Sequence, residues 1–214
     1  MKNKAMPAPV QIITEVGIMA ALGFVIDELQ SAISRGLFIA GGSIGFAMVC
    51  VIIMCYRRGF LAGLATGLIM SLLDVATGPY ILAGAWYKAF LQLLLDYVLA
   101  YPVVAVAASF RNPYMKSETR QKKFLFLVLG CVCGGLAKLA IHYLAGILFW
   151  ADPSNFAWDL TWMNPYLYCF VYNIAYMGPC IVLSIIICAL IFWKAPFIYE
   201  QPNRLYTMLE GEKE

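Results

Sequence analysis

Six long apolar runs constrain this chain more than any other feature. A helix needs about 20 apolar residues to cross a hydrocarbon core roughly 30 Å thick, and lipid-exposed backbone must satisfy its own hydrogen bonds. With 63% hydrophobic and 13% charged residues, the 214-residue chain is too apolar for a soluble domain. We therefore predict an all-α integral membrane protein with six transmembrane helices. The expected helices cover residues 12–33, 43–56, 60–75, 80–110, 124–150 and 165–193.

The second and third of these runs are short and lie on either side of Arg57, Arg58 and Gly59. This spacing predicts a tight hairpin of tilted or thinly spanning helices.

The basic residues gather on one side of the predicted membrane. Lys and Arg accumulate in short cytoplasmic loops, and twelve of the fifteen fall on one side when the N-terminus is placed inside. We expect a cytoplasmic N-terminus (1–11), one six-helix membrane domain (12–193) and a cytoplasmic tail (194–214). The net charge of +3 is then a result of topology and gives no reason to expect a nucleic acid as partner.

Ionisable residues inside the spans are functional candidates, because each costs about 2.5 to 3.5 kcal/mol on insertion scales. Glu15 lies in the first turn of the first predicted helix, where the helix dipole favours a carboxylate. Asp27 and Glu28 lie near the outer end of that helix, and Asp74 lies near the outer end of the third. We interpret these four residues as interfacial or capping groups.

The fourth, fifth and sixth helices carry the remaining polar residues. Steps of four place residues on one helix face, and such a stripe in the fourth helix holds Lys88, Gln92 and Asp96. The corresponding stripe in the fifth helix holds Lys138, His142, Gly146 and Trp150. The first half of the sixth helix is rich in polar aromatic residues and contains Tyr166, Tyr168, Tyr172, Asn173 and Tyr176.

Two interpretations fit these stripes. In the first, Asp96 forms a structural ion pair with Lys138, His142 is a buried structural residue, and the tyrosines form an interfacial belt. In the second, the stripes line a pocket for a flat, polar, cationic small molecule. A carboxylate accepts hydrogen bonds from an amine or an amidine-like ring edge, and a tryptophan face attracts a cation.

Catalytic and metal-binding patterns are not evident in the sequence. One histidine and scattered carboxylates give no metal cluster and no catalytic triad. The seven cysteines fit neither a disulfide framework nor a zinc pattern. The segment GGSIG (41–45) lacks the lysine of a phosphate-binding loop. We therefore expect no metal, no cofactor and no enzymatic activity.

Several segments resemble the thiamine-specific S components of energy-coupling factor transporters. In order, they are GGSIGFAMVCVIIMCYRRGFLAGLATGL, TGPYIL, LLLDYVLAY, KLAIHYLAGILFW and YLYCFVYN. The combinations HxxAGxxFW and YxxxxN are the most specific of these motifs. The resemblance runs from about residue 12 to residue 193.

The resemblance implies a six-helix protein of the bacterial cell membrane that binds thiamine from outside. It further implies delivery through a transmembrane coupling subunit and two cytoplasmic ATPase subunits, which alone use ATP. By motif, it implies ligand-binding roles for Tyr80, Asp96, His142, Trp150, Tyr168 and Asn173. We add Lys138 and Gly146 from the fifth-helix stripe as further ligand-binding candidates.

The division of roles within such a site is a hypothesis. Trp150 would face the cationic thiazolium ring, while Asp96, His142 and Asn173 would address the aminopyrimidine edge. Asp96 stands where the family has a glutamate, which is one methylene longer. On a regular helix, Tyr168 and Asn173 point about 140° apart. We therefore expect either an irregular first turn after Pro165 or a ligand that lies across the helix.

The first helix carries small residues that permit close helix approach in lipid. Gly17 and Ala21 lie four apart, with Ala20 and Gly23 beside them. This surface fits packing within the protein, and the resemblance implies docking of the coupling subunit through Gly17 and Ala21.

Three other functions remain open from the sequence. The chain could be an S component for a related heterocycle, such as a thiamine precursor. It could be a stand-alone secondary transporter that uses Asp96 and Lys138 as a proton-coupled pair. The third is an intramembrane enzyme that uses Asp96 and His142.

Overall fold

The computed structural model describes residues 8–34, 36–38, 41–82, 84–156 and 158–200. Its α-helices are α1 (Ala8–Ser34), α2 (Val49–Arg58), α3 (Phe60–Thr77), α4 (Trp86–Gln92), α5 (Arg111–Lys116), α6 (Arg120–Ala145) and α7 (Pro165–Lys194). Two π-helical segments, η1 (Leu93–Val98) and η3 (Gly146–Trp150), continue α4 and α6. Three 3-10 segments, η2 (Pro102–Phe110), η4 (Pro153–Asn155) and η5 (Pro196–Ile198), complete the described structure.

The predicted all-α membrane fold is confirmed. Within the described residues, five helical stretches are long and apolar enough to cross a membrane, and they cover 9–34, 60–77, 86–116, 120–150 and 165–194. The predicted cytoplasmic termini, 1–11 and 194–214, lie mostly outside the described residues. Their boundaries and their side of the membrane stay predictions.

The second apolar run, predicted for 43–56, forms α2, which is shorter than expected. It begins at Val49 instead of Ser43 and has only 10 residues. Its residues from Val49 to Tyr56 are all buried, and it packs against α1, α3, η2 and α7. An apolar run of this length is typical of a core helix, so protein packing accounts for its hydrophobicity and no lipid contact is needed.

The fourth predicted helix, 80–110, is divided into several segments. It begins at Trp86 and changes from α to π geometry at Leu93. The 3-10 segment η2 then starts at Pro102, which lacks the N–H that a continuous α-helix would use. Gly67 of α3 packs directly on this junction, where an added Cβ would lie 2.7 Å from the carbonyl oxygen of Tyr101.

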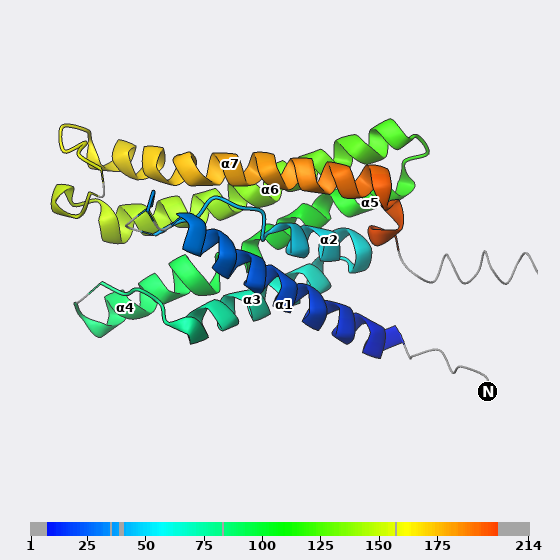
Figure 1. Ribbon diagram of the computed structural model, residues 1–214, viewed down its shortest axis with the longest axis horizontal. Helices are drawn as coiled ribbons and strands as arrows, with labels where there is room; N and C mark the ends of the chain where they lie inside the picture. Colours follow the sequence, from blue (N-terminus) through cyan, green and yellow to red (C-terminus); the bar gives the residue numbers. More distant parts are fainter. Residues whose placement is uncertain (1–7, 35, 39–40, 83, 157, 201–214) are drawn as a thin grey trace, which may run out of the picture.

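The bundle has two distinct ends (Figure 1). Helices α6 and α7 lie side by side along most of their length, and α1 crosses in front of α2 and α3. At one end lie the start of α1, the α2–α3 turn, α5 and the last turns of α7. At the other end lie α4 and the connection between α6 and α7. We call the first the closed end and the second the cavity end.

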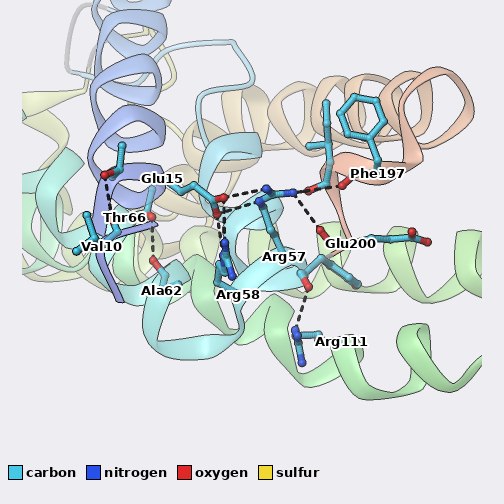
Figure 2. A network of polar contacts seen from close by, with 12 residues as sticks. Val10, Glu15, Arg57, Arg58, Ala62, Thr66, Arg111, Phe197 and Glu200 are labelled. Atoms are coloured by element: carbon cyan, nitrogen blue, oxygen red, sulfur yellow. Dashed lines mark hydrogen bonds and ion pairs between the residues drawn. The ribbon is translucent and has the colours of Figure 1, made fainter. Parts of the chain in front are cut away.

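At the closed end, Glu15 joins α1 to the α2–α3 turn (Figure 2). Its carboxylate accepts hydrogen bonds from Arg57 at 2.9 and 2.8 Å and from Arg58 at 2.8 and 3.0 Å. Arg57 also donates to the carbonyl oxygens of Phe197 and Glu200 at 3.2 and 3.0 Å. The helix starts at Ala8, so Glu15 does not lie in the first turn and the dipole explanation is wrong. Two guanidinium groups stabilise this carboxylate instead.

Candidate binding cavity

A cavity of about 500 Å³ lies at the cavity end of the bundle. Residues of α1, α3, α4, η1, α6, η3 and α7 line it, together with the segments that follow α1, α3 and η1. All eight residues predicted to bind the ligand are among them: Tyr80, Asp96, Lys138, His142, Gly146, Trp150, Tyr168 and Asn173. Residues from five different elements or loops therefore meet around one volume.

Asp96 and His142 lie beside each other in the lining of this cavity. The Asp96 Oδ1 atom lies 3.8 Å from His142 Nδ1, and both side chains are largely buried. Asp96 is carried by η1 and His142 by α6. A carboxylate beside an imidazole can accept from and donate to the edge of a heterocyclic ring.

Lys138 does not pair with Asp96. Its Nζ atom lies 3.5 Å from the centre of the Tyr101 ring, and the described residues contain no ion pair that involves it. The predicted structural pair of Asp96 with Lys138 is therefore wrong. Lys138 and His142 share one face of α6 and are about 6 Å apart along its axis, so the level at which Asp96 lies along α6 decides which of them it meets.

The acidic residues of α1 and α3 also belong to the cavity. Asp27, Glu28 and Asp74 line it, which contradicts their interpretation as interfacial or capping groups. Asp27 accepts hydrogen bonds from the Tyr101 hydroxyl and, at 2.6 Å, from Gln30 Nε2.

A signal for this acidic wall was present in the sequence. Asp27, Gln30, Ser31 and Ser34 follow the spacing of one helix face. The Ser34 hydroxyl accepts from the Ile44 backbone N–H at 3.0 Å, and Gln30 Oε1 accepts from that of Ala47 at 3.3 Å. This polar face of α1 therefore holds the segment before α2 and forms one side of the cavity.

An aromatic wall stands near the Asp96–His142 pair. The rings of Tyr80 and Trp150 stack with centroids 6.0 Å apart and an interplanar angle of 25°. Tyr168 stacks on Phe156 at 3.6 Å, and Tyr176 packs edge-on against His142 at 5.9 Å. Flat faces of this kind can hold a planar ring and attract a cation.

Asn173 is fixed by its own helix. Its Nδ2 donates to the Cys169 carbonyl at 2.8 Å, and its Oδ1 accepts from the Tyr176 hydroxyl at 2.6 Å. An added Cβ at Gly146 would lie 3.1 Å from Asn173 Nδ2. A glycine at this position therefore allows η3 to lie close against α7.

The start of α7 is regular. Pro165 occupies the first helical position, and Asn164 Oδ1 accepts from the N–H groups of Tyr166 and Leu167 at 3.0 and 3.4 Å. The expected irregular first turn is therefore wrong. Tyr168 and Asn173 both line the cavity, so a ligand that contacts both would lie across the helix.

Both π-helical segments lie at the cavity. Asp96 is in η1 and Trp150 is in η3. The π geometry is visible in the hydrogen bond from Leu99 N–H to the Leu94 carbonyl, five residues earlier, at 2.9 Å. Such segments are rare and frequently occur at functional sites. Hydropathy alone did not predict them.

Lys88 of the fourth-helix stripe and the small residues of α1 lie away from the cavity. Lys88 is exposed on α4 and does not line the cavity, so the fourth-helix stripe includes only Gln92 and Asp96. On α1, Ala20 is buried, whereas Gly17 and Ala21 are exposed. An added Cβ at Gly17 would meet nothing within 4 Å.

Membrane-length helices around a polar, aromatic-lined cavity define a multi-pass membrane protein with a small-molecule site. Comparison with known families shows to which family within this class the chain belongs. The family model described as "Thiamine transporter protein (Thia_YuaJ)" matches residues 13–200. The chain belongs to this thiamine transporter family, whose members are membrane transport proteins and not enzymes.

Relatives of this chain come from several bacteria. Thiamine transporter ThiT of Bacillus subtilis is 30% identical over 188 residues, which cover 85% of this chain and 90% of the relative. Thiamine transporter ThiT of Lacticaseibacillus paracasei is 22% identical, with coverage of 88% and 90%. A solved structure of ThiT from Listeria monocytogenes superposes with a TM-score of 0.75 at 26% identity, covering 91% of this chain and 100% of that one. The chain is accordingly a multi-pass protein of the bacterial cell membrane.

Proposed function

We propose that this protein is the thiamine-binding S component of an energy-coupling factor importer. It takes thiamine from outside into the cavity and passes it on with a coupling subunit and two ATPases. The observation that carries this proposal is the meeting of Asp96, His142, Trp150 and Tyr80 around one cavity. The names of the ThiT relatives support thiamine as the transported molecule.

The chemistry of the cavity suits both rings of thiamine. The aminopyrimidine ring has donors and acceptors along one edge, which Asp96 and His142 can match. The thiazolium ring is planar and carries a fixed positive charge, which suits the stacked faces of Trp150 and Tyr80.

The charge of the cavity favours the same ligand. Its described lining holds four carboxylates, those of Asp27, Glu28, Asp74 and Asp96, against the single amine of Lys138. Counted at formal charge with histidine neutral, the lining has three more negative than positive charges. A cleft with walls of one sign concentrates ligands of the opposite sign.

The partner surface is proposed on α1. Gly17 and Ala21 leave a shallow exposed strip among larger apolar side chains such as Ile18 and Leu22, and small residues allow another membrane helix to approach closely. ATP is used only by the partner subunits, and the chain itself requires no cofactor. Both termini are placed in the cytoplasm in this proposal.

A related heterocycle, such as a thiamine precursor, is the nearest alternative ligand. Asp96 has one methylene fewer than the glutamate that the resemblance implies at this position, which leaves a related ring edge open as the ligand. A stand-alone proton-coupled transporter is less well supported, since Asp96 and Lys138 do not form the pair that it would use.

Intrinsic tryptophan fluorescence tests the ligand. Thiamine, its phosphates and its free pyrimidine would be titrated into the purified protein, without ATP or a proton gradient. We expect thiamine to quench the fluorescence and Trp150→Phe to remove most of this quenching. Trp162→Phe is the matched control, because Trp162 is 78% exposed and does not line the cavity. Absence of binding for every ligand, checked by calorimetry, would refute the proposal.

Substitution of Ala21 tests the partner surface. Ala21→Trp should abolish thiamine uptake by the full complex and leave binding by the isolated protein unchanged, because the bulky ring blocks only helix approach. Leu29→Trp, on an exposed position of the same helix, is the control. Normal uptake by the Ala21→Trp complex would exclude this surface.

A further inference from the structure

The segment between α3 and α4 carries Tyr80, one of the two stacked rings beside the cavity. Gly78 ends α3 with a φ of 110°, a conformation that favours glycine, and turns the chain toward Tyr80. The Tyr80 side chain is 66% exposed, and it stacks on Trp150. A ring this exposed is placed by its backbone more than by packing.

Two side chains hold that backbone in place. Gln92 Oε1 accepts from the Leu82 N–H at 2.9 Å, and Gln92 Nε2 donates to the Tyr80 carbonyl at 3.2 Å. The Tyr97 hydroxyl accepts a hydrogen bond from the Tyr80 N–H at 2.8 Å and donates one to the Tyr80 carbonyl oxygen at 3.3 Å. Gln92 is only 2% exposed, so water cannot readily replace its hydrogen bonds.

The π geometry of η1 explains how both side chains reach the same segment. Residues five apart on an α-helix point about 140° apart. In a π-helix the backbone bond joins residues five apart, which brings Gln92 and Tyr97 to the same side. The same segment directs Asp96 toward His142, so one helical irregularity serves both the ring-edge pair and the aromatic wall.

We propose that Gln92 is a positioning residue for the ligand. It fixes residues 78–82 so that the Tyr80 ring stays on Trp150 beside the cavity, and this placement slows release of the bound molecule. The inference rests on the proposed function, because it concerns the same cavity. Both polar groups of the Gln92 amide bond the loop backbone. Gln92 also lines the cavity, so the test must separate an effect through Tyr80 from direct contact with the ligand.

The test compares thiamine release from Gln92→Met and from the unaltered protein by stopped-flow fluorescence. Methionine keeps the length of the side chain and removes both hydrogen bonds. We expect the dissociation rate to rise about tenfold, whereas the association rate changes by less than about twofold. Gln92→Glu keeps the acceptor for Leu82 and should give a smaller rise, and it replaces Gln92→Met if that variant does not fold. The control is Gln121→Met, on an exposed position of α6.

A Tyr80→Ala background separates positioning from direct contact. If Gln92 acts through Tyr80, Gln92→Met should change release no further in that background, because coupled residues give non-additive effects. A tenfold change that persists without the Tyr80 ring would overturn the proposal. An unchanged dissociation rate in Gln92→Met alone, or a loss of thermal stability with no change in release, would also overturn it.

A measurement without ligand distinguishes this inference from the proposed function. In a variant that keeps Trp150 and replaces the other four tryptophans by phenylalanine, Gln92→Met should increase quenching of Trp150 by acrylamide. Loss of thiamine binding by the unaltered protein would refute the proposed function and leave this readout intact. Equal acrylamide quenching with and without Gln92 would refute the positioning role alone.

Discussion

The closed end and the cavity end of the bundle differ in whether their carboxylates have guanidinium partners. At the closed end, Glu15 lies between two guanidinium groups, and Arg57 also caps the carbonyls after α7 (Figure 2). At the cavity end, the described lining of the cavity includes four carboxylates and no arginine, and these groups surround an open volume. Charges inside a membrane protein are costly unless paired. The difference therefore indicates that the first end is built for stability and the second for a ligand.

Removal of the Asp96 carboxylate should have the largest effect, a loss of thiamine binding at the cavity end. We expect Asp96→Ala to weaken thiamine binding about 100-fold, because truncation of one partner leaves the other buried groups unpaired. Calorimetric titration measures this effect, and the melting temperature should change little. Asp96→Glu, which lengthens the side chain by one methylene and keeps the charge, is the informative companion. Unchanged affinity in Asp96→Ala would show that the carboxylate does not touch the ligand.

Removal of the Glu15 charge should act on the closed end alone. Glu15→Gln breaks two partly exposed ion pairs, and we expect the free energy of unfolding to fall by about 1 to 2 kcal/mol, discounted for solvent exposure. Thermal unfolding in detergent measures the loss, and thiamine affinity should stay the same. Glu118→Gln, on an exposed position without an ion pair among the described residues, is the control. A loss of binding free energy for thiamine as large as the loss of unfolding free energy would contradict separate roles for the two ends.

The excess negative charge of the cavity should have the smallest effect. Asp74 has no ion pair among the described residues and lines the cavity, so Asp74→Asn removes one charge with little change of shape. We expect thiamine affinity to fall about threefold, as for one partly screened charge, and the loss to shrink at high salt. Asp159→Asn, in the exposed segment before α7, serves as control. Tighter thiamine binding by Asp74→Asn would contradict electrostatic attraction of a cation.

Sequence reasoning found the cavity residues that occur in specific motifs. Asp96, His142, Trp150 and Asn173 lie in segments that resemble one family, and all four line the cavity. It misplaced Asp27 and Asp74, because distance along a span suggested an interface and gave no information on which helix lies opposite. Lys88 shares a stripe with Gln92 and Asp96, but it is exposed near the start of α4 and does not line the cavity.

The apolar runs and the motifs are sufficient to predict a helical membrane protein and the segments that carry its polar residues. Apolar length and residue type are local properties, so they can be read one segment at a time. Three-dimensional packing was needed to show that α2 is buried, that Asp96 meets His142 instead of Lys138, and that Gln92 holds the backbone of Tyr80. These outcomes depend on helix rotation and on π-helical turns, which result from packing between segments far apart in the chain.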